Sequence, residues 1–100
     1  MTAGHCVQDE AACANVKFVF GFGIKKEGVL PEKVAPSEVY KCAKIVAQTL
    51  EGEGADYALI QLDRKVSKHK VLEIDRTNSI ANGDAIYVIG HPSGLPTKVA

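Results

Sequence analysis

Residues 15–22 read Asn-Val-Lys-Phe-Val-Phe-Gly-Phe, and this stretch decides the fold class. Its three phenylalanines occupy every second position, so in an extended chain their rings share one face. A period of two predicts a β-strand. β-branched residues are also frequent, with eleven valines and seven isoleucines among 100 residues. The sequence therefore favours short strands over helices.

The remaining elements follow the same pattern. Further extended segments are expected at residues 38–49, 57–62, 71–74, 85–89 and 97–100. The first of these alternates in polarity and predicts a strand, although its alanines and lysines also permit a helix. One short helix is expected over residues 6–13, and residues 90–96 are expected to form an irregular loop because they hold two prolines and two glycines. Short strands with frequent turn signals predict an all-β barrel or sandwich.

Composition limits the classes of protein to which the chain can belong. Its hydrophobic fraction is 46% and its charged fraction is 24%, and both are typical of globular proteins. Twelve basic and twelve acidic residues give a formal charge of zero, so no nucleic-acid partner is expected. No apolar run is long enough to span a bilayer, and the first five residues contain no apolar core of a signal peptide. One small domain, or part of one, is the expectation.

Two motifs stand out from this background. Residues 2–6 read T-A-G-H-C, and residues 56–63 read D-Y-A-L-I-Q-L-D. The first closely resembles the T-A-A-H-C motif around the catalytic histidine of trypsin-like (chymotrypsin-fold) serine proteases. The second resembles the D-I-A-L-L-x-L stretch that begins with the catalytic aspartate of that family. Order and separation are also similar, since His5 precedes Asp56 by 51 residues.

A third segment extends the resemblance over nearly the whole chain. Residues 83–96 read G-D-A-I-Y-V-I-G-H-P-S-G-L-P and look like the strand that opens the second barrel of secreted bacterial members. The implied fold is part of a double β-barrel, mainly the N-terminal barrel. Residues 1–82 would be the C-terminal part of the first barrel, and residues 83–100 the beginning of the second.

The resemblance implies that His5 is a general base and Asp56 the carboxylate that orients it. Imidazole suits the first role because its ordinary pKa lies near 6.5. A carboxylate on the far ring nitrogen selects the tautomer and stabilises the imidazolium that forms. The implied activity is hydrolysis of peptide bonds in protein or peptide substrates, with no cofactor and no metal.

Other readings of the candidate residues stay open. Asp56 could instead cap a turn after Gly54. Asp63 could compete as the triad acid, but its two basic neighbours favour a surface ion pair. His69 lies between two lysines and is expected to be solvated, and His91 is expected to have a structural or surface role.

The serines depart from the family pattern. Its nucleophile lies in a G-D-S-G-G or G-N-S-G-S type of segment, and none of the four serines has that context. Ser93, in Pro-Ser-Gly, is the nearest imitation. We therefore expect an excised part of a longer, exported bacterial protease, secreted or periplasmic, with the nucleophile outside the chain. The chain alone is expected to be inactive and to self-associate through open strand edges.

The three cysteines are interpreted through the same resemblance. In the family, the cysteine next to the catalytic histidine usually pairs with an upstream one, so Cys6 would be unpaired here. Cys13 and Cys42 flank neighbouring candidate strands and are the expected disulfide. A metal site built from His5 and the three cysteines is the alternative, but adjacent His5 and Cys6 suit tetrahedral coordination poorly.

Two rival functions remain at this level. The first is a protease homologue that lacks the serine and acts as a protein-binding module; the sequence downstream of residue 100 would discriminate it from an enzyme. The second is a small β domain in which both motifs are coincidental. A large distance between His5 and Asp56 in the folded chain of an intact domain would favour it.

Overall fold

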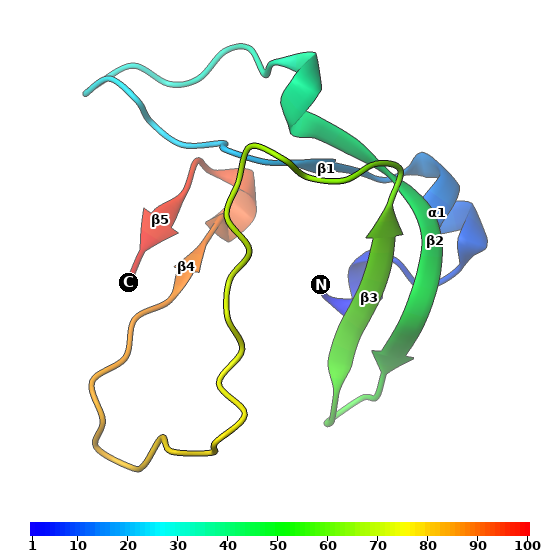
Figure 1. Ribbon diagram of the computed structural model, residues 1–100, viewed down its shortest axis with the longest axis vertical. Coiled ribbons are helices and arrows are strands. Elements are labelled where there is room, and N and C mark those ends of the chain that lie inside the picture. Colours follow the sequence, from blue (N-terminus) through cyan, green and yellow to red (C-terminus); the bar gives the residue numbers. More distant parts are fainter. The chain divides into compact units, whose positions relative to one another are not determined.

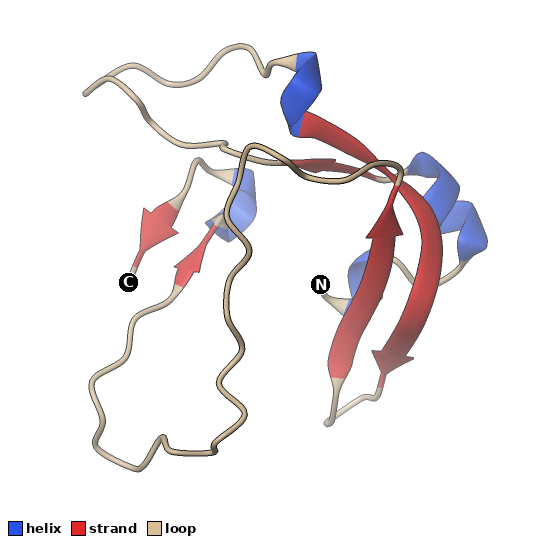
Figure 2. Cartoon of the chain, in the orientation of Figure 1, coloured by secondary structure: helices blue, strands red, loops and turns tan.

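The structure is a computed structural model that describes all 100 residues, and it is mostly β with little helix (Figures 1 and 2). Its chain divides into two compact units. The first comprises Met1–Gly21 and Lys33–Lys65, and the second comprises Phe22–Glu32 and Val66–Ala100. None of the helices has the length and apolar character needed to cross a membrane.

The first unit contains a three-stranded antiparallel sheet. Its strands are β1 (Lys17–Val19), β2 (Val39–Leu50) and β3 (Asp56–Leu62), with β2 in the centre. The strands predicted for residues 38–49 and 57–62 are thus confirmed. Alternation outweighs the helix propensity of alanine and lysine because β2 has a pairing strand on each side. Two register shifts interrupt the β2–β3 ladder, and irregularities of this kind bend a strand, as the curved ribbons of Figure 1 show.

The helix and the strand at the start of the chain differ from expectation. The helix α1 spans Glu10–Asn15 rather than residues 6–13, because Asp9 caps it: the Asp9 carboxylate accepts a hydrogen bond from the Ala12 N–H at 2.8 Å. A 3₁₀ turn, η1 (Gly4–Cys6), precedes it. Of the strand predicted over residues 15–22, only the three residues of β1 are present, because α1 includes residue 15 and the pairing with β2 ends at Val19.

The core of this unit is small and lies between α1 and the sheet. Four of its apolar residues are buried: Val7, Cys13, Tyr40 and Ala58. A disulfide joins Cys13 in α1 to Cys42 in β2, so the expected pairing is present. Disulfides persist in oxidising surroundings, and the bond therefore indicates an extracellular or periplasmic type of environment.

Arg64 covers the end of the sheet where β2 begins. A 3₁₀ turn, η2 (Pro36–Glu38), leads into β2 there. The Arg64 guanidinium lies 3.9 Å from the centre of the Tyr40 ring and donates to the Ser37 carbonyl at 3.1 Å. A cation over an aromatic face is attractive, and here it also covers the largest buried side chain of the unit.

The second unit has little regular structure. A two-stranded antiparallel sheet joins β4 (Ile89–Gly90) to β5 (Lys98–Val99) through a 3₁₀ turn, η3 (Pro92–Gly94). The segment expected at 97–100 is confirmed in its central part, whereas residues 71–74 form no strand and residues 85–89 contribute only their last residue. Most large apolar side chains of this unit are exposed, and they include Val71, Leu72, Ile74, Ile86, Tyr87 and Val88. No closed barrel is formed, because two-residue strands bury too little apolar surface.

Candidate active site

A short backbone pairing brings the two motifs together in the first unit. The Thr2 N–H donates to the Ala58 carbonyl at 2.9 Å, and the Ala58 N–H donates to the Thr2 carbonyl at 2.7 Å. This antiparallel bridge lays the N-terminal segment along the outer edge of β3, and Figure 1 shows the N-terminus beside that strand. His5 follows Thr2 by three residues and Asp56 precedes Ala58 by two, so the bridge delivers both to the same end of β3.

His5 and Asp56 are in direct contact. The ring Nδ1 of His5 lies 2.5 Å from Asp56 Oδ2, and the backbone N–H of His5 donates to Asp56 Oδ1 at 2.8 Å. Both carboxylate oxygens are therefore bonded to the same residue. The ring is turned so that Nε2, the nitrogen opposite Nδ1, faces away from the carboxylate.

The electrostatics favour an ionised carboxylate. The side-chain hydrogen bond with His5 is the main cause that lowers the pKa of Asp56, and the backbone N–H of His5 lowers it further, while partial desolvation opposes them. The Asp56 side chain is 34% exposed and that of His5 is 60% exposed, so the pair lies at the surface of this unit. An ionised carboxylate can only accept, which assigns the shared proton to Nδ1 of the imidazole.

Gly4 permits the close approach of the histidine turn to the sheet. A Cβ at this position would lie 2.1 Å from the Thr49 carbonyl oxygen and 2.9 Å from the Tyr57 carbonyl oxygen. Those two residues are paired across β2 and β3, so η1 sits directly on the ladder. Sequence reasoning did not single out Gly4, although a signal exists: T-A-G-H-C has glycine where the T-A-A-H-C motif has alanine.

The competing acid Asp63 and one of the two other histidines, His91, have partners of their own. Asp63 pairs with Arg64 at 3.3 Å and also accepts the Lys41 backbone N–H at 3.1 Å, as the surface ion-pair interpretation expects. In the second unit, His91 Nδ1 lies 3.0 Å from the Leu95 carbonyl oxygen. Asp63 therefore has hydrogen-bonding partners other than His5.

No serine of the first unit adjoins the pair. Ser37 is its only serine, and it lies in η2, just before β2 begins. Asp56 pairs with Leu50 at the opposite end of the same twelve-residue strand. Cys6 is exposed and unpaired, whereas the sulfurs of Cys13 and Cys42 are bonded to each other and are not thiolate ligands for a metal.

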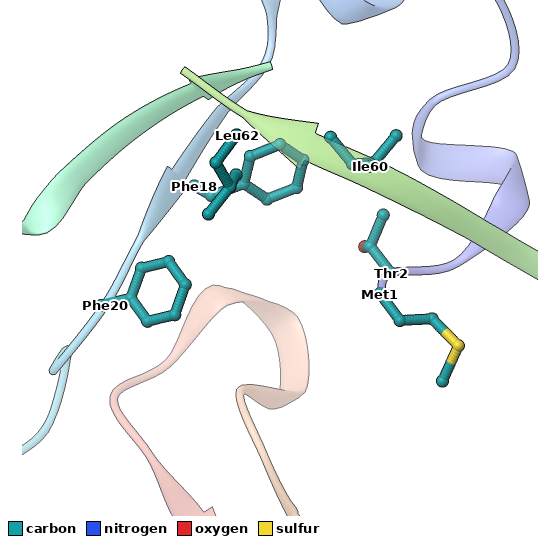
Figure 3. Close-up of a pocket in the computed structure, with 6 residues that line it drawn as sticks. All are labelled: Met1, Thr2, Phe18, Phe20, Ile60 and Leu62. Carbon is teal, nitrogen blue, oxygen red and sulfur yellow. The ribbon is translucent and has the colours of Figure 1, made fainter. Parts of the chain in front are cut away.

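An apolar pocket lies beside the C-terminal half of β3, between β1 and the N-terminal segment (Figure 3). Its lining contains no charged side chain and consists of Met1, Thr2, Phe18, Phe20, Ile60 and Leu62. It therefore offers mainly hydrophobic surface, and the Thr2 hydroxyl is the one polar side-chain group in its lining.

Comparison with known proteins identifies the family to which the chain belongs. Searches of curated proteins and of solved structures found no match. The sequence profile of the trypsin-like peptidase domain, in contrast, matches residues 1–100, the whole chain. The chain therefore belongs to the trypsin-like peptidase family, and its kinship is with serine proteases.

Proposed function

We propose that His5 is the general base and Asp56 the orienting carboxylate of a Ser-His-Asp triad in a serine endopeptidase. The observation that supports the proposal best is the double hydrogen bond from His5 to the two oxygens of Asp56, at 2.5 and 2.8 Å. An imidazole held through Nδ1 presents the lone pair of Nε2 to a reacting group, which is the arrangement that a general base requires.

The reaction would proceed by acyl transfer. Nε2 of His5 takes the hydroxyl proton of a serine while the serine oxygen attacks the carbonyl carbon of the scissile peptide bond. The imidazolium then gives that proton to the leaving amine, and Asp56 stabilises the positive charge in the interval. Water repeats the sequence on the acyl-enzyme and restores the serine.

The nucleophile would come from sequence outside this chain. The position of Ser37 at the far end of β2 supports this, as does the absence of a protease-type serine motif. The backbone donors that stabilise the oxyanion would come from the same missing part. Residues 1–82 would then form the C-terminal part of a first barrel and residues 83–100 the start of a second. The disulfide is in keeping with a secreted or periplasmic bacterial enzyme.

The proposal is tested in the natural polypeptide that contains these residues, by hydrolysis of casein and of an ester substrate. His5→Ala and Asp56→Asn should each lower kcat by roughly 10³-fold or more, as the loss of a triad member does. Asp63→Asn is the matched control, because its carboxylate contacts Arg64 and Lys41 rather than His5.

Two other results would point elsewhere. Full activity in both His5→Ala and Asp56→Asn would remove the pair from the mechanism. A natural polypeptide that hydrolyses neither substrate and reacts with no serine-directed fluorophosphonate would instead favour the protein-binding homologue.

A further inference from the structure

Gln48 joins the sheet to the turn that carries the histidine. It lies on β2 opposite Ala58, the fully buried residue of β3, so its side chain shares the inner face of the sheet. Its Nε2 donates a hydrogen bond to the carbonyl oxygen of Gly4 at 3.1 Å, in partly buried surroundings. The two residues are 44 positions apart in sequence, so this is a tertiary contact.

The next residue of β2 touches the same glycine. The Cα of Gly4 lies so close to the Thr49 carbonyl that an added Cβ would be 2.1 Å from its oxygen. Two consecutive residues of one strand thus fix Gly4, one by a hydrogen bond and one by contact. Contact alone limits how closely η1 approaches β2, whereas a hydrogen bond also restricts the orientation of η1, because hydrogen bonds are directional.

We propose that Gln48 is a positioning residue: by holding the Gly4 carbonyl, its amide orients η1 so that both donors of His5 reach Asp56. The importance of this role for catalysis rests on the proposed function of the pair. The geometric part does not, because it concerns only whether the His5–Asp56 contact forms.

Gln8, the other glutamine whose side chain bonds to η1, cannot position the turn in the same way. Gln8 Nε2 donates to the His5 carbonyl at 3.2 Å, but Gln8 is exposed and lies only three residues further along the same segment. Its bond therefore moves with the turn and does not connect it to the sheet. Gln48 is the residue whose side chain connects the turn to β2.

The experiment uses selectively ¹³C-labelled aspartate in the chain and compares wild type with Gln48→Met and Gln61→Met. Methionine keeps the length of glutamine and removes the donor. Gln61 is the matched control, because it is an exposed glutamine on the neighbouring strand. The first readout is the pH titration of the Asp56 carboxyl carbon, and the second is the downfield resonance of the His5 Nδ1 proton.

An internal reference separates local misalignment from unfolding. The Thr77 hydroxyl, then the Thr77 N–H and the Ser79 hydroxyl, lower the pKa of Asp75 in the second unit, independently of η1. In Gln48→Met we expect the Asp56 titration to move toward its ordinary value and the Nδ1 proton signal to be lost, while Asp75 is unchanged. Losing one hydrogen bond of ordinary strength should reduce the ratio of aligned to misaligned turn about fivefold. Gln61→Met should change neither readout.

Each of the remaining outcomes supports or contradicts the positioning role of Gln48. An unchanged Asp56 titration in Gln48→Met would overturn the positioning role. If the variant fails to fold, hydrogen exchange of the wild-type side-chain amides replaces it. The Gln48 amide should then exchange at least about tenfold more slowly than that of Gln61, and equal rates would overturn the proposal. A wild type in which Asp56 titrates normally would contradict the pair itself, and with it the proposed function.

Discussion

Both oxygens of the Asp56 carboxylate are bonded to one residue, His5: Oδ2 to the ring Nδ1 at 2.5 Å and Oδ1 to the backbone N–H at 2.8 Å. The aspartate begins a strand, and the histidine lies in a 3₁₀ turn held against that strand. A rotation of the ring breaks the first bond, and a shift of the turn breaks both. Alignment of the pair therefore depends on the path of the η1 backbone as well as on the two side chains.

The stabilising contribution of the His5–Asp56 contact is expected to be lost in acid. Because the pKa of Asp56 is lowered in the folded chain, its ionised form is bound more tightly there than in the unfolded chain. Its contribution to stability is thus fully present above the unfolded value, near pH 3.9, and is lost as the pH falls through the lower folded value. Thermal unfolding of wild type and Asp56→Asn should differ at neutral pH and converge below about pH 4. A difference that grows on acidification would contradict this.

Gly4→Ala should misalign the site. A Cβ at this position would lie 2.1 Å from the Thr49 carbonyl oxygen, so η1 has to move away from the ladder. We expect destabilisation of about 1–3 kcal/mol, as overpacking usually causes. The Asp56 titration, followed by ¹³C NMR, should also return toward its ordinary value. Gly52→Ala is the control, because a Cβ there meets no atom within 4 Å. Equal behaviour of the two variants would show that the turn tolerates a side chain.

Loss of the disulfide should be costly, whereas loss of the free thiol should not. Cys13 and Cys42 are 29 residues apart, and a closed loop of that length stabilises by about 3–4 kcal/mol in the chain-entropy model. Replacing both with serine should lower the free energy of unfolding by that amount, measured in denaturant. Cys6→Ser should change it little. Non-reducing peptide mapping should find the 13–42 link, and a peptide linked through Cys6 would disprove the pairing.

The chain should self-associate at micromolar concentration. Its sheets are open at their edges, and no barrel closes them. Many large apolar side chains are also exposed; among them are Val46 at 55%, Tyr87 at 73% and Leu72 at 88%. Burying several hundred Å² of such surface at about 25 cal/mol per Å² is worth several kcal/mol, comparable to the stability of a small domain. Sedimentation velocity should show oligomers, and a strictly monomeric folded species would refute the expectation.

The chain alone should not hydrolyse peptides or esters. It holds the proposed base and its carboxylate, but Ser37 lies at the wrong end of β2 to be the nucleophile. A fluorophosphonate probe should leave the chain unlabelled, with trypsin as the positive control. Labelling of Ser93, or hydrolysis abolished by His5→Ala, would require a nucleophile within these 100 residues.

The family, the candidate pair and the two longest strands could all be predicted from the amino-acid sequence. Motifs around His5 and Asp56 are local signals, legible without a fold. Alternation over residues 38–49 and the apolar run over 57–62 are local too, and both became strands. The same reasoning overestimated strand length at residues 15–22, because α1 ends only at Asn15 and the β1–β2 pairing ends at Val19. It also overestimated strand length at residues 85–89, of which only Ile89 pairs with β5.

How His5 and Asp56 are held together could not be predicted in this way and depends on tertiary contacts. The Thr2–Ala58 bridge, the contact of Gly4 with Thr49 and the bond from Gln48 each join residues that are more than 40 positions apart. No pattern within a window of ten residues contains such information, because it depends on which strand lies beside which and in what register. Closure of a barrel is non-local for the same reason: it requires enough paired strands, whatever the propensity of each one.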